Sequence, residues 1–163
     1  MTAPSSVRHP LSIEHITIEA TKTFEHVKTA FENLVPPLDP NVFATLLAGE
    51  VDRARDALER LPPLSIFAAR NHGGLLQIVG PARKAIQYEI GNPLTATRMT
   101  RVRLSASLYA PLRVTLYESA GGRAVFEYDL PSSLLGQFDD ERITAVGREL
   151  DAALERVLLE TAH

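Results

Sequence analysis

The chain has 163 residues, of which 45% are hydrophobic and 23% charged, and its formal net charge is −3. These values are ordinary for a globular protein, and the length suits one domain that buries its own core. The absence of cysteine excludes disulfides, thiolate metal sites and cysteine nucleophiles, and the acidic balance disfavours a nucleic-acid partner.

The first segment, MTAPSSVRHPLS, lacks the apolar run of a secretory signal peptide. No apolar stretch in the sequence approaches the roughly twenty residues that a membrane-spanning helix requires. We therefore expect a cytoplasmic protein without a membrane partner, and a loose tail over residues 1–11.

Alternating residues predict a first strand over residues 12–19. A helix should follow, and either Thr21 or Thr23 is suited to cap it. Its apolar stripe consists of Phe24, Val27, Phe31 and Leu34. The pair Pro36-Pro37 ends this helix.

Residues 40–61 carry an apolar stripe that steps by three or four and stays in phase across Gly49. This pattern predicts one long helix with a dent at the glycine. Asp39 suits its cap and Pro40 its first position. Strands are then predicted over residues 64–69 and 84–90, separated by a break at Asn71-His72-Gly73-Gly74 and a brief helical turn.

A helix over residues 93–102 precedes a β-hairpin, in which PLRVTLYES and RAVFEYD flank Ala120-Gly121-Gly122. The short loop predicts that Val114 and Leu116 share the core face with Phe126 and Tyr128. It also places Arg113 opposite Asp129 on the other face. That other face carries Arg113, Thr115, Tyr117, Val125, Glu127 and Asp129.

The last predicted helix begins at a cap formed by Asp139 or Asp140. Its stripe consists of Ile143, Val146, Leu150, Leu154 and Val157. Helices and hairpin strands therefore mix along the chain. This order predicts a single α+β domain over residues 1–163, a two-layer sandwich in which a mostly antiparallel sheet packs against helices.

Several short motifs between residues 64 and 135 resemble one known family. They are His72 after a strand, Gly91-Asn92-Pro93 after the next, Pro111-Leu112-Arg113-Val114, Leu116-Tyr117-Glu118, and Tyr128-Asp129-Leu130-Pro131. With these motifs the chain resembles the domain of unknown function 302 family, also called the TT1751-like fold. The resemblance implies a compact α+β domain that is often dimeric, and it implies no activity. Against that pattern, residues 36–63 look like a helical insertion.

Gly-Asn-Pro at residues 91–93 has a full structural explanation, because Asn92 can cap a helix whose first residue is Pro93. A helix N-terminus also offers free N–H groups and a positive dipole end, with the hydroxyls of Thr95 and Thr97 nearby. A small anionic ligand is therefore a candidate at this position. We favour the structural role, because no Walker loop or dinucleotide-binding fingerprint is present.

His72 is the candidate acid/base residue, although a lone histidine more often pins its own loop by a hydrogen bond. Together with His15 and His26 it could hold a metal, but no HxH or HxxxH spacing supports this. We therefore expect no metal site and no cofactor. The arginines at 98, 101 and 103 are interpreted as a solvated face.

The polar face of the hairpin is the other candidate site. Arg113 can bind a planar anion through two hydrogen bonds, with Tyr117, Glu127 and Asp129 beside it. The alternative is a surface ion pair between Arg113 and Asp129, which contributes little to stability. We favour the ion pair.

The leading hypothesis is a non-catalytic homodimeric module for binding or interaction, in which the 40–61 stripe covers a partner or its twin. Its candidate ligand-binding residues are Asn92, Thr95, Arg113, Tyr117, Glu127 and Asp129. The alternative is a cofactor-free enzyme, in which His72 is the acid/base and Arg113 with the Asn92 helix end holds an anionic substrate. That enzyme requires the three residues to converge. A purely structural protein would have no deep pocket.

Overall fold

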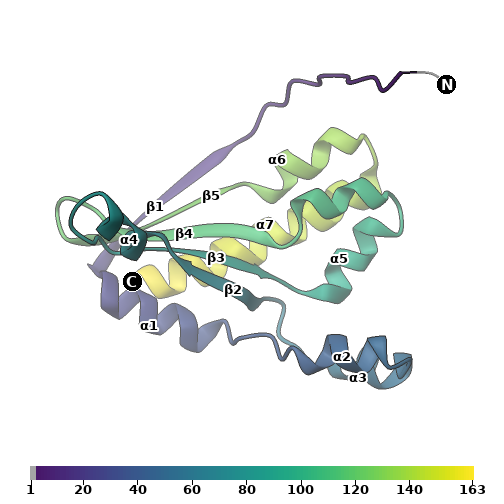
Figure 1. Cartoon of the computed structure of the whole chain (residues 1–163), viewed down its shortest axis with the longest axis horizontal. Coiled ribbons are helices and arrows are strands. Elements are labelled where there is room, and N and C mark those ends of the chain that lie inside the picture. The colour runs from purple at the N-terminus through teal and green to yellow at the C-terminus, as the bar shows by residue number, and fades with distance from the viewer. Residues whose placement is uncertain (1–2) are drawn as a thin grey trace.

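The computed structural model describes residues 3–163, and its elements form two layers (Figure 1). One layer is an antiparallel sheet in the order β1-β5-β4-β3-β2. Its strands are β1 (His15–Thr23), β2 (Ser65–Asn71), β3 (Ala85–Gly91), β4 (Leu112–Glu118) and β5 (Arg123–Asp129). The predicted α+β sandwich with an antiparallel sheet is confirmed.

The helices cover one face of this sheet and lie at both of its ends. They are α1 (Phe24–Leu34), α2 (Asn41–Leu47), α3 (Val51–Glu59), α4 (His72–Leu75), α5 (Pro93–Thr100), α6 (Pro131–Leu135) and α7 (Glu141–Ala162). Within residues 3–163 there are also three 3₁₀ turns: η1 (Leu76–Ile78), η2 (Leu104–Tyr109) and η3 (Gly136–Phe138).

The main core lies between the sheet and the pair formed by α1 and α7. Strand residues alternate between the two faces of a sheet, so Tyr88 and Phe126 both point toward the helices. The ring of Phe31, from α1, lies 4.9 Å from that of Tyr88 and 5.5 Å from that of Phe126. This aromatic contact fixes α1 across the central strands.

The hairpin register agrees with the prediction. Val114 stands opposite Tyr128 and Leu116 opposite Phe126, and all four side chains are buried. The sheet face away from α1 and α7 carries mostly polar side chains along these strands, as is usual for an antiparallel sheet with one solvated face.

The long helix predicted over residues 40–61 is wrong. The chain forms two helices instead, because Gly49 between them has φ +83°, a conformation that ends a helix and that glycine adopts without strain. α2 and α3 pack against each other as a helical hairpin. An apolar stripe that stays in phase across a glycine is compatible both with one bent helix and with two packed helices, so the sequence pattern could not decide between them.

Other helix and strand boundaries also differ from the predicted ones. β1 begins at His15 and continues to Thr23, whose side chain caps α1. Asp140 caps α7, whereas Asp139 has a left-handed backbone with φ 50°. The sequence predicted neither η2 nor α6, and α6 begins at Pro131, a residue that fits the first helical position.

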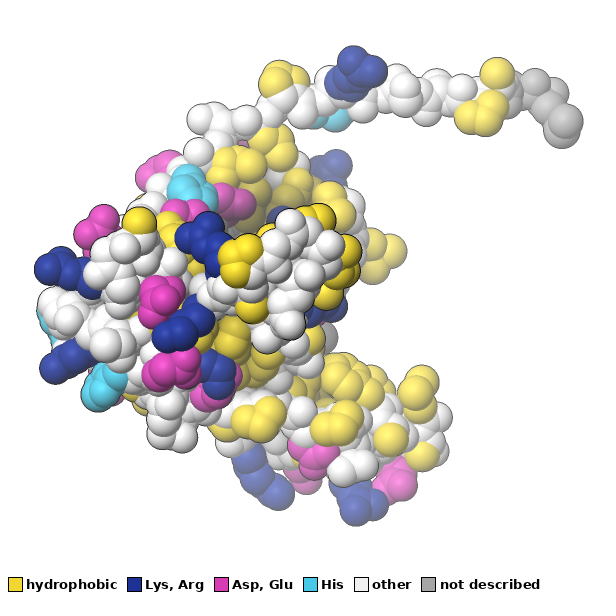
Figure 2. Space-filling model, turned by 60° about the vertical axis from the view of Figure 1, so that its left-hand side comes forward, with side chains coloured by type: hydrophobic (Ala, Val, Ile, Leu, Met, Phe, Trp, Pro, Cys, Tyr) yellow, Lys and Arg dark blue, Asp and Glu magenta, His cyan; other side chains and the backbone are white. Residues whose placement is uncertain are grey.

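Residues 3–13 form an extended arm that leaves the body at the start of β1 and stands clear of it in Figures 1 and 2. The tail predicted over residues 1–11 corresponds to this arm, apart from residues 1–2, which lie outside the described part. Within residues 3–163, no helix combines the length and apolar character that crossing a bilayer requires.

Candidate functional site

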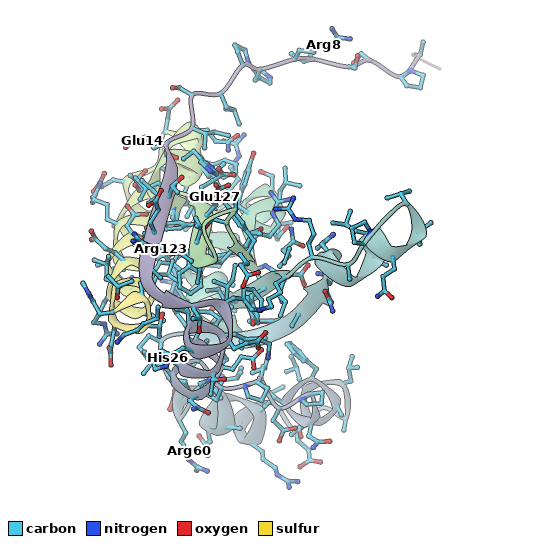
Figure 3. The ribbon with its side chains drawn as sticks, turned by 90° about the vertical axis from the view of Figure 1, so that its left-hand side faces the viewer. Arg8, Glu14, His26, Arg60, Arg123 and Glu127 are labelled. Atoms are coloured by element: carbon cyan, nitrogen blue, oxygen red, sulfur yellow. The ribbon has the colours of Figure 1, made fainter. Side chains whose placement is uncertain are left out.

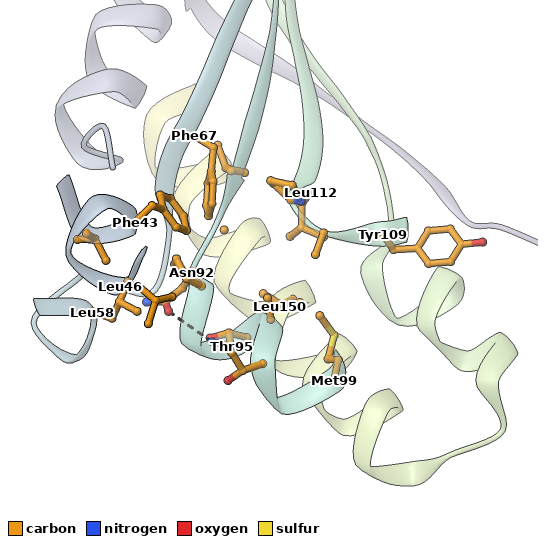
Figure 4. A pocket seen from close by; sticks show the side chains of 18 residues that line it. Phe43, Leu46, Leu58, Phe67, Asn92, Thr95, Met99, Tyr109, Leu112 and Leu150 are labelled. Atoms are coloured by element: carbon orange, nitrogen blue, oxygen red, sulfur yellow. Dashed lines mark hydrogen bonds between the residues drawn. The ribbon is translucent and has the colours of Figure 1, made fainter. Parts of the chain in front are cut away.

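A cavity of about 320 Å³ lies at one end of the sheet, between the α2–α3 hairpin, α5 and the ends of β2, β3 and β4 (Figure 4). Its volume is within the range of natural small-molecule sites. Most of its wall is made of apolar side chains. They include Val42, Phe43, Leu46, Leu58, Phe67, Ile90, Met99, Leu112 and Leu150.

The α2–α3 hairpin forms one wall of the cavity, through Phe43 and Leu46 of α2 and Leu58 of α3. The chain before α2 is attached to the edge of the sheet by two backbone hydrogen bonds. The N–H of Ile66 donates to the carbonyl of Pro36 at 2.9 Å, and the N–H of Leu38 donates to the carbonyl of Ile66 at 2.8 Å. The hairpin is therefore anchored at its base on β2.

Phe67 reaches the cavity because β2 is irregular at this point. The register of β2 against β3 shifts between Ile66 and Ala68, which leaves Phe67 without a partner opposite. An extra residue of this kind bends a strand and redirects a side chain. Figure 4 shows Phe67 and Phe43 on the same side of the cavity, although they come from different elements.

Asn92 caps α5, as predicted. Its Oδ1 accepts hydrogen bonds from the backbone N–H groups of Leu94 at 2.9 Å and Thr95 at 3.4 Å. Its Nδ2 donates to the carbonyl of Pro62 at 3.1 Å. The cap therefore occupies the two N–H groups that a bound anion would need, which argues against the predicted anion site.

The cavity offers few polar groups. Thr97 lines the cavity, but its hydroxyl donates to the carbonyl of Leu94 at 2.7 Å. Thr95 also lines it, and its hydroxyl makes no protein hydrogen bond within residues 3–163. Among the described residues, no charged side chain lines the cavity. The chemistry of its wall thus suits a largely apolar molecule with few hydrogen-bonding groups.

His72 lies at the other end of the sheet. β2 and β3 are antiparallel, with Asn71 opposite Ile86, so the end of β2 lies beside the start of β3. Asn92 follows the far end of β3, which places it roughly 20 Å from His72 at about 3.4 Å per residue. The structure does not bring His72, Asn92 and Arg113 into the single pocket that the enzyme hypothesis requires.

The polar face of the hairpin has partners that the sequence analysis did not predict. Asp129 binds His15 of β1, with 2.9 Å between Oδ1 and Nδ1. The other ring nitrogen of His15 lies 3.4 Å from Glu127, which also accepts a hydrogen bond from Tyr117 at 2.8 Å. Within residues 3–163 no ion pair joins Arg113 to Asp129, so the expected cross-strand pair is replaced by one with His15.

These contacts raise the pKa of His15 above its ordinary value of 6.5, chiefly through the hydrogen bond to Asp129, with Glu127 adding to the effect. The same carboxylate of Glu127 raises the pKa of Tyr117. Within residues 3–163, no group of three or more His, Asp or Glu side chains is arranged to hold a metal ion.

The sequence does not identify most of the cavity residues as ligand-binding residues, because Phe43, Leu46 and Phe67 look like ordinary core residues in a sequence. The useful signal was the apolar stripe of residues 40–61, which one small core does not need. Only Asn92 and Thr95 of the predicted ligand-binding residues line the cavity. Arg113, Tyr117, Glu127 and Asp129 lie outside it.

Fold and site together define a two-layer α+β protein with an apolar cavity beneath a helical hairpin. The sequence of residues 48–161 matches the family described as "Domain of unknown function DUF302", and the chain belongs to that family. The match begins between α2 and α3.

The fold is also found in a solved structure, the crystal structure of the uncharacterized conserved protein DUF302 from Bacillus stearothermophilus. It superposes with a TM-score of 0.65 over 91% of this chain and 98% of that chain, at 14% sequence identity. No curated protein matches the sequence.

Proposed function

We propose that this protein is a non-catalytic, homodimeric binding module whose cavity holds a small apolar molecule. The observation that carries the proposal is the wall of the cavity, which is made almost entirely of apolar side chains and, among the described residues, contains no charged one. Protein interiors are otherwise closely packed, and hollows much larger than a water molecule are few. An apolar hollow of about 320 Å³ is therefore well suited to a ligand.

The wall also restricts the class of ligand. An anion would need a cationic side chain or free N–H groups, and the Asn92 cap occupies the two nearest N–H groups. A neutral molecule with a ring or a short acyl chain meets Phe43, Phe67 and Met99 instead. The hydroxyl of Thr95 can accept or donate one hydrogen bond, so an alcohol, ketone or ester suits the site better than a hydrocarbon.

The homodimer is supported by apolar side chains that remain exposed in a single chain. Leu104 and Leu108 of η2 are 81% and 77% exposed and lie close together in the sequence. Clustered exposed apolar residues of this kind are typical of interaction surfaces.

Native mass spectrometry of the freshly purified protein, compared with the same sample after denaturation, tests the proposal. We expect a dimer mass that exceeds twice the chain mass by a neutral organic molecule, and loss of that excess on denaturation. Extraction into an organic solvent would then identify the molecule. A charged ligand such as a phosphate ester in the cavity would contradict the proposed ligand class, and a monomer at all concentrations would contradict the dimer.

A further inference from the structure

The N-terminal arm, residues 3–13, joins the body of the protein at Glu14, whose backbone is held by two hydrogen bonds. The carbonyl of Glu14 accepts a hydrogen bond from Leu130 N–H at 2.8 Å, and the N–H of Glu14 donates to Ser133 Oγ at 3.1 Å. Every residue of the arm beyond this point is exposed. Figure 3 shows Glu14 at the root of the arm and Arg8 far out along it, away from the body.

The arm carries apolar side chains that its own chain leaves at least partly exposed. Val7 is 75% exposed, and Leu11 and Ile13 are more than 40% exposed. Two prolines, Pro4 and Pro10, favour an extended backbone, and residues 3–14 contain no glycine that would allow a sharp turn. The arm is thus an extended segment with a few apolar side chains, and it points away from its own body.

The root of the arm lies at the end of the sheet that holds the cavity. His15 at the start of β1 pairs with Asp129 at the end of β5. β4 begins and β3 ends at this same end, because Leu112 pairs with Ile90 beside the cavity. The arm and the cavity therefore belong to one end of the molecule.

A partly apolar surface connects the root of the arm with the cavity. A second, small hollow of about 30 Å³ lies next to the cavity and is lined by Leu108 and Leu134 together with the charged residues Arg113 and Asp129. It shares three lining residues with the cavity, which are Tyr109, Pro111 and Leu112. We call this surface the strand-end track, defined by Leu108, Tyr109, Pro111, Leu112 and Leu134.

The dimensions of the arm suit the strand-end track. Three steps between neighbouring strands separate β1 from β3, which corresponds to about 14 Å at about 4.8 Å per step. An arm over residues 3–13 spans at most about 36 Å when fully extended. It can therefore cover the whole track, from Leu108 to the mouth of the cavity.

We infer that the arm of one copy lies along the strand-end track of a second copy, with Leu11 against Leu108, and closes the mouth of the partner's cavity. The second copy is favoured because the arm is extended and directed away from its own body. Reciprocal exchange buries two arms and two tracks in one twofold dimer. This inference rests on the dimer of the proposed function, but it does not depend on the identity of the ligand.

Cysteine cross-linking tests the arm directly, because the natural sequence has no cysteine. One protein carries Leu11→Cys and a second, labelled with ¹⁵N, carries Leu108→Cys; both are mixed and mildly oxidised. A third protein with Ile78→Cys, equally exposed but at the far end of the sheet, replaces the Leu108→Cys protein in the control. Because only one of the two proteins carries ¹⁵N, mass spectrometry distinguishes a disulfide between the two different proteins from a disulfide between two identical chains.

We expect the mixed disulfide between the Leu11→Cys and Leu108→Cys proteins to form at least about tenfold faster than the control product, since docking raises the effective thiol concentration. Equal rates would overturn the inference. So would a double variant, L11C with L108C, that forms its disulfide only within one chain, because the arm would then cover its own track. Binding of an apolar dye, measured separately, reports on the cavity whatever the arm does.

Discussion

Asn92 and Pro62 are joined by a hydrogen bond of 3.1 Å from the Asn92 side-chain amide to the Pro62 carbonyl. Asn92 begins α5, and Pro62 ends the segment that contains α2 and α3. One side chain therefore caps a helix and holds the base of the hairpin that covers the cavity. The three residues Gly91-Asn92-Pro93 are a structural joint, placed beside the candidate site.

Replacing Asn92 separates these two roles. Asn92→Ala removes both, and we expect a loss of about 1–2 kcal/mol in the free energy of unfolding, the usual effect of losing an N-cap. Asn92→Ser keeps a capping oxygen but loses the bond to Pro62, so its loss should be smaller. Urea unfolding of both variants measures the difference. Equal losses would show that the cap contributes nothing beyond the bond to Pro62.

Gly49 should tolerate a side chain poorly. Its φ of +83° is unfavourable for any other residue, so Gly49→Ala should cost about 1 kcal/mol of unfolding free energy even though nothing lies within 4 Å of the new Cβ. Gly136 is the matched control, because it also has open space but a φ of −60°. Gly136→Ala should be neutral or slightly stabilising. If both variants unfold alike, the break between α2 and α3 is not where the structure puts it.

The β1–β5 contact should weaken as the pH rises through the folded pKa of His15. The pKa of His15 is raised above its unfolded value of 6.5 by Asp129 and Glu127. A raised pKa means that the stabilisation is complete below pH 6.5 and is lost as the pH rises through the folded pKa. We expect the stability difference between the natural protein and Asp129→Asn to shrink over that range. NMR titration of His15 should show a lower pKa in Asp129→Asn, and an unchanged pKa would contradict the contact.

His72 should not matter for ligand binding. It lies roughly 20 Å from Asn92, and residues this far apart with no shared partner act independently. We therefore expect His72→Ala to bind an apolar dye within about twofold of the natural protein. A dye titration checks this. A large loss would revive a role for His72 at the cavity.

Much of the fold could be predicted from local patterns. The alternation in the hairpin and its short loop predicted that Val114 faces Tyr128, and the structure has that pair. Asn92 was predicted as a cap because its side chain acts on the next few residues. Such features depend on neighbours in the sequence, and local physics is sufficient to predict them.

The site could not be predicted in the same way. The cavity combines Phe43, Phe67, Met99 and Leu112, which lie far apart in the chain, and its shape exists only once α2 and α3 are placed. The partner of Asp129 was missed for a similar reason, since the pairing of β1 with β5 joins residues 114 positions apart. The anion site at α5 was predicted from free N–H groups that the predicted cap itself occupies.

The most direct test of the apolar cavity is titration with the neutral fluorescent dye N-phenyl-1-naphthylamine. Ala96→Leu adds apolar volume inside the cavity, and Ala152→Leu adds the same group on the exposed surface of α7 as a control. We predict that Ala96→Leu weakens dye binding about tenfold or more, which corresponds to an overpacking cost of about 1.4 kcal/mol. Ala152→Leu should bind as the natural protein does. Equal dye affinity in all three proteins would contradict an apolar binding site in this cavity.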